Sequence, residues 1–185
     1  MNGYVRVTAG KWRSRKVVCP PAHVRPTTSW AREMLFAWLR SCVNATVLDA
    51  TAGSGILGLE ALSRGAAHAH FWDIEPAVLT QLQQNVDHLQ AQAVCEKIDV
   101  TEVQRNYFSP ESIDMLLYDP PYQAPWALEA LERLLSFGWV KPAGWVFFES
   151  HQPGPERLGL WVLYRQKQRG QVCLNLYHQH NNNGL

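Results

Sequence analysis

The chain contains 185 residues, of which 46% are hydrophobic and 18% charged, and this length is typical of one domain. The apolar fraction and the eight tryptophans exclude an intrinsically disordered protein. No apolar run approaches the roughly 18 residues of a membrane span, and the N-terminal segment lacks the apolar core of a secretory signal. The four cysteines, Cys19, Cys42, Cys95 and Cys173, have no metal-ligand spacing. We therefore expect reduced thiols, a cytoplasmic protein and no bound metal or membrane.

The net charge of +1 conceals an uneven distribution of charge along the chain. Residues 1–40 carry eight Lys or Arg and one acidic residue, a net charge of +7, whereas the remainder carries nine basic and fifteen acidic residues, a net charge of −6. A basic arm on a mildly acidic body indicates a polyanionic partner that meets one end of the protein. From charge alone, a solvated basic hairpin is an equally good interpretation.

The first 40 residues predict a hairpin followed by a helix. Residues 4–9 alternate weakly and carry Val5 and Val7, and residues 15–19 carry Val17 and Val18; with Gly10 between the two runs, a short hairpin is plausible. The proline-rich residues 19–28 predict a loop. A helix is then expected up to about Arg40, with Thr27, Thr28 or Ser29 as its N-cap, because the following apolar residues have helical spacing.

From Thr46 onward, strand-like runs alternate with helical ones. This alternation predicts an α/β fold with a mostly parallel sheet and helices on both faces, and the last two runs predict an antiparallel hairpin. The expected strands are TVLDA, HAHFWD, AVCEKI, SIDMLLYD, GWVFFE, LWVLYRQ and VCLNLYHQ, with helices at 56–64, 76–89 and 125–137 and a short helix after AVCEKI. In such sheets a ligand binds where the strands end, so functional residues should directly follow the strands.

The first strand is followed by a glycine turn that fits GxGxxG, with Gly53, Gly55 and Gly58. By itself this motif is weak evidence for a nucleotide site. The acidic Asp49, at the strand end, would repel a pyrophosphate and attract a cation. S-adenosylmethionine carries an ammonium and a sulfonium and no phosphate. The turn therefore favours this cofactor, which glycine allows the backbone to approach closely.

Two further acidic residues follow the next two strands. Asp73 is placed to accept hydrogen bonds from both hydroxyls of a ribose, and Glu75 is the alternative ligand or a helix cap. Asp99 is placed to accept the amino group of an adenine, although a surface acid at a helix start is equally ordinary.

The fourth strand is followed by Asp119, Pro120, Pro121 and Tyr122, the most specific motif in the chain. The prolines have no N–H to donate, so the turn offers acceptors, namely the Asp119 carboxylate and the Pro120 carbonyl. Two acceptors suit an exocyclic amino group and hold its lone pair toward an electrophile. Tyr122 offers an aromatic face to a planar base. The alternative is a proline turn that merely ends a strand.

These motifs resemble the class I S-adenosylmethionine-dependent methyltransferases that act on exocyclic amines, which have a Rossmann-like fold. The runs VRVTAGKWRSRKVVCPP, VRPTTSWAREMLFAWL and GQVCLNLY are similar to the RsmD family, bacterial guanine-N2 methyltransferases of small-subunit (16S) ribosomal RNA. The resemblance covers residues 3–179 and implies a seven-stranded sheet ending in an antiparallel hairpin, with a small N-terminal hairpin and helix as an extension. It implies a division into an RNA-contacting extension (1–42), a methyltransferase domain (43–180) and a flexible tail (181–185).

The resemblance assigns roles to individual residues. The family's cofactor residues carry over onto Asp49, Thr51, Gly53, Gly55, Asp73 and Asp99, and its catalytic motif onto Asp119, Pro120, Pro121 and Tyr122. Thr51 stands where the family often has phenylalanine, which predicts one altered cofactor contact. The expected RNA-contacting residues are Arg6, Lys11, Trp12, Arg13, Arg15, Lys16 and Arg25, with Trp12 stacking on an unpaired base. The implied substrate is ribosomal RNA within a 30S assembly intermediate, bound by a monomer.

Other functions compete with this hypothesis. The DPPY motif is shared with adenine-N6 DNA and RNA methyltransferases, so it does not by itself choose the base. An NAD-binding oxidoreductase would explain the glycine turn but not Asp49 or the proline turn. An RNA-binding module without catalytic turnover is the remaining alternative.

Overall fold

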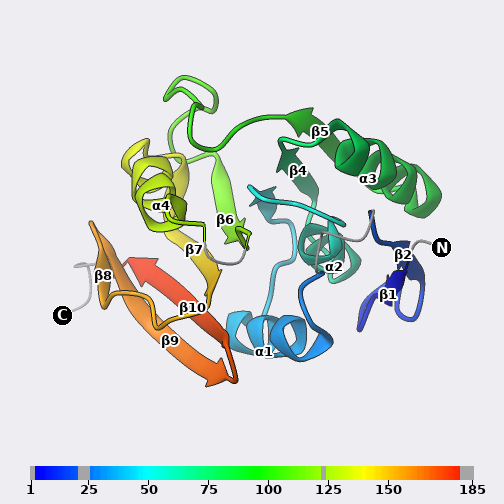
Figure 1. Ribbon diagram of the computed structural model, residues 1–185, viewed down its shortest axis with the longest axis horizontal. Helices are drawn as coiled ribbons and strands as arrows, with labels where there is room; N and C mark the ends of the chain where they lie inside the picture. The colour runs from blue at the N-terminus through cyan, green and yellow to red at the C-terminus, as the bar shows by residue number, and fades with distance from the viewer. Residues whose placement is uncertain (1–2, 21–25, 122–123, 180–185) are drawn as a thin grey trace.

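The computed structural model describes residues 3–20, 26–121 and 124–179. Its centre is an eight-stranded sheet with the strand order β5-β4-β3-β6-β7-β10-β9-β8, and a separate two-stranded hairpin, β1 and β2, lies at the other end of the molecule from β8 (Figure 1). The strands are β1 (Tyr4–Arg6), β2 (Lys16–Val18), β3 (Thr46–Asp49), β4 (His68–Asp73), β5 (Ala93–Lys97), β6 (Ile113–Tyr118), β7 (Val140–Ser150), β8 (Arg157–Leu158), β9 (Trp161–Arg169) and β10 (Val172–Gln179).

The strands from β3 to β7 form a parallel sheet whose order reverses in the middle. The chain runs outward from β3 through β4 to β5, then returns to place β6 on the other side of β3 and β7 beyond it. Between β3 and β6 the connections leave in opposite directions, and in open α/β sheets ligands bind at the carboxyl ends of the strands at such a point. The hairpin of β9 and β10 extends the sheet in the antiparallel sense. The predicted α/β fold with its closing hairpin is confirmed.

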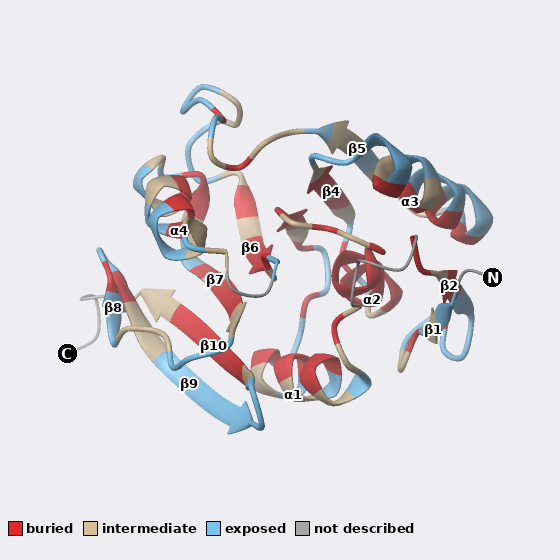
Figure 2. Ribbon diagram, in the orientation of Figure 1, coloured by how far each residue is buried: buried red, intermediate tan, exposed pale blue. Residues whose placement is uncertain are grey.

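Helices cover both faces of the sheet. The helices are α1 (Ser29–Leu39), α2 (Ile56–Ser63), α3 (Pro76–Leu89) and α4 (Ala127–Ser136). Neighbouring strand residues point to opposite faces, so Leu117 packs in the core beneath α1, α2 and α3, whereas Leu116 packs in the core beneath α4. The buried residues of β6 and β10 and the exposed β9 are visible in Figure 2. None of the described helices is long and apolar enough to cross a membrane.

The helix starts follow their sequence signals. The Thr28 side chain caps α1 by accepting a hydrogen bond from the Ala31 N–H at 3.2 Å, as one of the three predicted cap residues. Pro76 occupies the first turn of α3, where its missing N–H is harmless. Both helices end within one residue of their predicted ends.

Two details differ from the prediction. Residues 98–112 form turns in place of the expected short helix, and the Asp99 carboxylate closes the first turn by accepting the Thr101 N–H at 2.8 Å. The main sheet has eight strands rather than seven, because the two-residue β8 pairs with the start of β9. A two-residue strand is too short to show any periodicity in the sequence.

A buried carboxylate of α2, that of Glu60, binds the N-terminal hairpin. This side chain is fully buried and accepts hydrogen bonds from the Thr8 N–H at 2.9 Å and the Ala9 N–H at 3.0 Å. It also pairs with the guanidinium groups of Arg32 on α1 at 2.8 Å and of Arg64 at 3.0 Å. The Glu60 carboxylate therefore joins the hairpin, α1 and α2, so the predicted extension and the methyltransferase body share one core.

Replacing Glu60 with Gln should strongly destabilise the protein. The substitution leaves the buried Arg32 guanidinium without its counter-charge, and breaking a buried pair in this way costs about 3–5 kcal/mol of unfolding free energy. Urea unfolding followed by circular dichroism measures the loss, with Glu33→Gln, at an exposed position of α1, as the matched control. Equal unfolding free energies for the two variants would contradict the role given to Glu60.

Candidate active site

The predicted acidic residues gather at the carboxyl edge of the parallel sheet. Asp49 ends β3 and Asp73 ends β4, while Asp119 directly follows β6 and Asp99 lies two residues beyond β5. Because β3 pairs with β6, the residues after these two strands are adjacent, and the Ala50 N–H donates to the Leu117 carbonyl at 3.0 Å. The site therefore lies at the point where the strand order reverses.

Asp49 is a buried carboxylate, with 1% of its surface exposed. Its Oδ2 accepts the Gly58 N–H at 3.0 Å, while its Oδ1 is buried without a hydrogen-bond partner. Burial raises the pKa of Asp49 to about 7; the Gly58 hydrogen bond opposes the rise, and the nearby carboxylates of Asp119 and Asp73 add to it. A cation bound beside this group would favour its ionised form, so the orphaned oxygen indicates a cationic ligand.

The glycine turn between β3 and α2 depends on backbone conformations that favour glycine. Gly53 and Gly55 have φ angles of 53° and 76°, and Gly55 immediately precedes α2. At Gly58, a Cβ atom would lie 2.3 Å from Cε1 of Phe71 on β4. The first two glycines thus shape the turn, and the third allows α2 to pack closely on the sheet.

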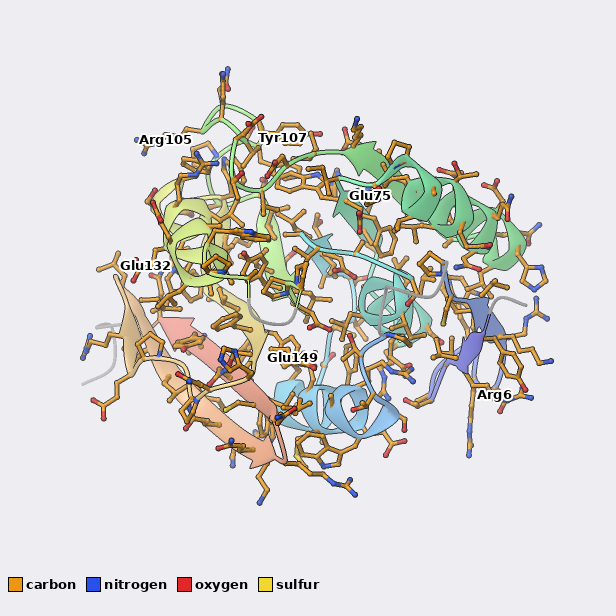
Figure 3. The ribbon with its side chains drawn as sticks, in the orientation of Figure 1. Arg6, Glu75, Arg105, Tyr107, Glu132 and Glu149 are labelled. Atoms are coloured by element: carbon orange, nitrogen blue, oxygen red, sulfur yellow. The ribbon has the colours of Figure 1, made fainter. Side chains whose placement is uncertain are left out.

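Asp73 ties this turn to the end of β4. Its Oδ2 accepts the Gly53 N–H at 3.0 Å, and its Oδ1 accepts the Glu75 N–H, also at 3.0 Å. Glu75 is exposed at the start of α3 and makes no side-chain cap (Figure 3). The structure thus brings Asp73, and not the Glu75 side chain, into contact with the glycine turn.

Asp119 is held between two threonines. Its backbone N–H donates to the Thr51 hydroxyl at 2.9 Å, and its Oδ2 accepts the hydroxyl of Thr27 at 2.5 Å. Thr51 was expected at the cofactor, but its described contact is with Asp119. Tyr122 and Arg25, two further predicted site residues, lie outside the described residues.

A pocket of about 200 Å³ opens beside Asp119, Pro120 and Pro121. It lies between the start of α4 and the segment 148–155, which contains the end of β7 and the loop toward β8. Glu149, which lines this pocket, lies near the middle of the molecule in Figure 3. The sequence analysis did not single out this loop, because its residues form no recognisable motif.

The predicted basic surface is present on the hairpin, with one correction. Arg6, Lys11, Arg13, Arg15 and Lys16 are all exposed, and Arg6 lies at the edge of the molecule in Figure 3. Trp12 does not fit its predicted stacking role, because it is only 8% exposed and packs in the core against α2. Its ring is the apolar anchor of the hairpin.

An exposed aromatic residue that the sequence analysis missed lies on the same hairpin. Tyr4 is 51% exposed, and its ring centre lies 4.2 Å from the Lys16 ammonium and 5.3 Å from the Arg6 guanidinium. The signal was its position two residues before Arg6, since alternate strand residues share a face.

Comparison with known proteins identifies the family. A family model described as Conserved hypothetical protein 95 matches residues 5–178. Ribosomal RNA small subunit methyltransferase D of Escherichia coli (strain K12) is 36% identical over 181 residues, covering 95% of this chain and 90% of the relative. Its counterpart in Haemophilus influenzae is 33% identical over 187 residues, covering 95% of this chain and 94% of the relative. This chain belongs to the RsmD family.

Solved structures agree with this assignment. The Escherichia coli protein yhhF superimposes on this RsmD-family chain with a TM-score of 0.82 and 35% sequence identity, covering 96% of this chain and 98% of that chain. The fold also matches a SAM-dependent methyltransferase from Aquifex aeolicus, with a TM-score of 0.62 and 15% identity, over 79% of this chain and 87% of that chain. The protein is a methyltransferase.

The pKa of Asp49 predicts how the stability of this RsmD-family protein depends on pH. A carboxyl group with a pKa of about 7 in the folded chain, against an ordinary value of 3.8, binds its proton more tightly when folded. The unfolding free energy contributed by this group therefore falls as pH rises from about 4 to about 7. Asp49→Asn cannot ionise, so its unfolding free energy should fall less over this range.

Urea unfolding at several pH values tests this expectation without any ligand. The exposed Glu129→Gln on α4 is the control, and its pH dependence should match that of the wild type. A parallel pH dependence for Asp49→Asn and the wild type would show that Asp49 ionises normally in the folded chain.

Proposed function

We propose that this protein transfers a methyl group from S-adenosylmethionine to the exocyclic N2 of a guanine in small-subunit ribosomal RNA. The proposal depends on the position of Asp119. Its N–H donates to the hydroxyl of Thr51, which precedes the glycine turn, and Asp119 also lines the pocket of about 200 Å³. The E. coli and H. influenzae relatives, named as ribosomal RNA small subunit methyltransferases, support the choice of RNA.

The residues at the sheet edge fit the cofactor. The orphaned Oδ1 of Asp49 suits a cationic group, and Gly53 and Gly55 have no side chains of their own to keep an adenosyl group away. We assign the ribose hydroxyls to Asp73 and the adenine amino group to Asp99. When bound, S-adenosylmethionine supplies a methyl group on a sulfonium, and an amine that attacks this methyl carbon releases the sulfur as a neutral thioether.

The protein's contribution to methyl transfer is to orient a weak nucleophile. The lone pair of an exocyclic amine is delocalised into the base, so the nitrogen must be turned toward the methyl carbon. The Asp119 carboxylate and the Pro120 carbonyl would each accept a hydrogen bond from one N–H of the exocyclic amine. The hydrogen bond to Asp119 strengthens as positive charge develops on the nitrogen. One proton leaves the nitrogen after the new N–C bond has formed. Tyr122 would stack on the base.

The basic hairpin would bind the RNA backbone. Arg6 and Arg13 line a cleft of about 620 Å³ between the hairpin and the start of α1, and this cleft also contains Thr27, the partner of Asp119. An RNA strand lying along the hairpin would therefore lead toward the active site. We further propose that the substrate is a 30S assembly intermediate in the cytoplasm and that the enzyme acts as a monomer.

Transfer of tritiated methyl groups to small-subunit particles that lack the modification tests the proposed function. A nuclease digest of the labelled RNA should contain N2-methylguanine, and Asp119→Ala should lower turnover by at least about 100-fold while calorimetry shows unchanged cofactor affinity. N6-methyladenine in the digest would instead support the adenine-N6 alternative. Normal turnover of Asp119→Ala would contradict the role of this residue.

Removing charge from the hairpin should weaken RNA binding. Each lost phosphate contact lowers the affinity and flattens its dependence on salt, so Arg13→Gln and Arg15→Gln together should reduce the slope of log K against log salt by about 1–2. Filter binding between low and moderate salt measures this slope. The double variant Arg133→Gln and Arg169→Gln, which removes two positive charges elsewhere, is the control. An unchanged slope would favour a merely solvated hairpin.

A further inference from the structure

We propose that Thr27 and Thr51 are positioning residues that fix Asp119 for methyl transfer. The proposal rests on the proposed function and assigns a role to Thr27 and a further role to Thr51. Neither threonine is given a contact with the reacting atoms. Both act through the orientation of the catalytic aspartate.

Thr27 controls the carboxylate of Asp119. Its hydroxyl donates to Oδ2 at 2.5 Å, and the Thr27 residue is only 6% exposed. A hydroxyl has a single hydrogen, and in this contact it is committed to one carboxylate oxygen. The bond therefore constrains the rotation of the carboxylate and, with it, the direction in which Oδ1 points.

Thr51 controls the backbone of the same residue. Its hydroxyl oxygen accepts the Asp119 N–H at 2.9 Å. Pro120 and Pro121 have no N–H, so the Asp119 N–H is the donor through which this turn can be fixed at its start. Because Thr51 belongs to the segment that becomes the glycine turn, the contact keeps the acceptor turn at a constant distance from the proposed cofactor site.

Thr27 lies beside the start of a helix, α1, that is bonded to a buried carboxylate. Thr27 directly precedes the cap residue of α1, and on this helix Arg32 is held by the buried Glu60 carboxylate at 2.8 Å. The side chain of Arg32 also donates to the Arg6 carbonyl at 2.9 Å. The hydroxyl that orients Asp119 therefore lies directly before a helix that is bonded to the basic hairpin.

Loss of this alignment should lower the rate and leave cofactor binding intact. A displacement of about 1 Å at a reacting group can cost roughly 100-fold in rate. We expect Thr27→Val to lower kcat by roughly 10- to 100-fold, with the Kd for S-adenosylmethionine unchanged within about twofold. Thr27→Ser keeps the hydroxyl and should recover most of kcat. Thr51→Val and Thr51→Ser should behave in the same way.

Thr80→Val is the control, because it removes the hydroxyl of an exposed threonine on α3, which donates to the Pro76 carbonyl of the same helix. Its kcat should equal that of the wild type. The proposal is overturned if Thr27→Val keeps full kcat, if Thr27→Ser is as slow as Thr27→Val, or if Thr80→Val is as slow as Thr27→Val. The kcat of each variant is compared with that of the active wild-type protein.

A crystal structure of Thr27→Val supplies a test that does not depend on the substrate. We expect the Asp119 carboxylate to rotate or to occupy more than one orientation when the hydroxyl is absent. An unchanged carboxylate in this variant would overturn the proposal. If the wild type fails to methylate ribosomal RNA, the proposed function fails, and the crystal structure still decides the role of Thr27.

Discussion

The pairing of β3 with β6 is the contact on which the whole site depends. These two strands are separated by more than sixty residues, yet their backbones are joined in parallel with Asp49 opposite Leu117. The pairing places the glycine turn that follows β3 beside the proline turn that follows β6. A glycine turn and a proline turn that belong to different parts of the sequence therefore lie side by side at the end of a single hydrogen-bonded strand pair.

The electrostatics of this edge oppose the stability of the free protein. Asp49 is buried near two other carboxylates, which raise its pKa along with the effect of burial. Such an arrangement costs folding free energy unless a cation is present, and functional sites commonly keep it for that reason. The binding of a cationic cofactor would relieve the cost, so the same cluster that weakens the free protein favours its ligand.

The buried Glu60 carboxylate and its hydrogen-bond and ion-pair partners attach the charged N-terminal hairpin to the apolar body of the protein. The buried carboxylate satisfies backbone N–H groups of the hairpin and the guanidinium groups of Arg32 and Arg64 at the same time. Trp12 completes the attachment by packing in the core. The positive charges of the hairpin thereby stay exposed while the hairpin itself is held firmly against α2.

Most of the helices and strands, and the acidic residues that follow the strands, could be predicted from the sequence alone. These features are local signals, because each depends on residues that are near one another in the sequence. They include the strand and helix patterns, the glycine turn, the cap of α1 and Pro76. The resemblance to the RsmD family added the methyltransferase activity. The roles of Asp73, Asp99 and Tyr122 stay predictions.

The contacts between side chains that are far apart in the sequence could be seen only in the folded structure. The contacts of Asp119 with Thr27 and Thr51 join residues 92 and 68 positions apart, and those of Glu60 with the hairpin join residues about fifty apart. No periodicity records such pairs, since they follow from strand order and helix packing. The burial of Trp12 was missed for the same reason, because which face of a hairpin meets the body depends on the surface against which it packs.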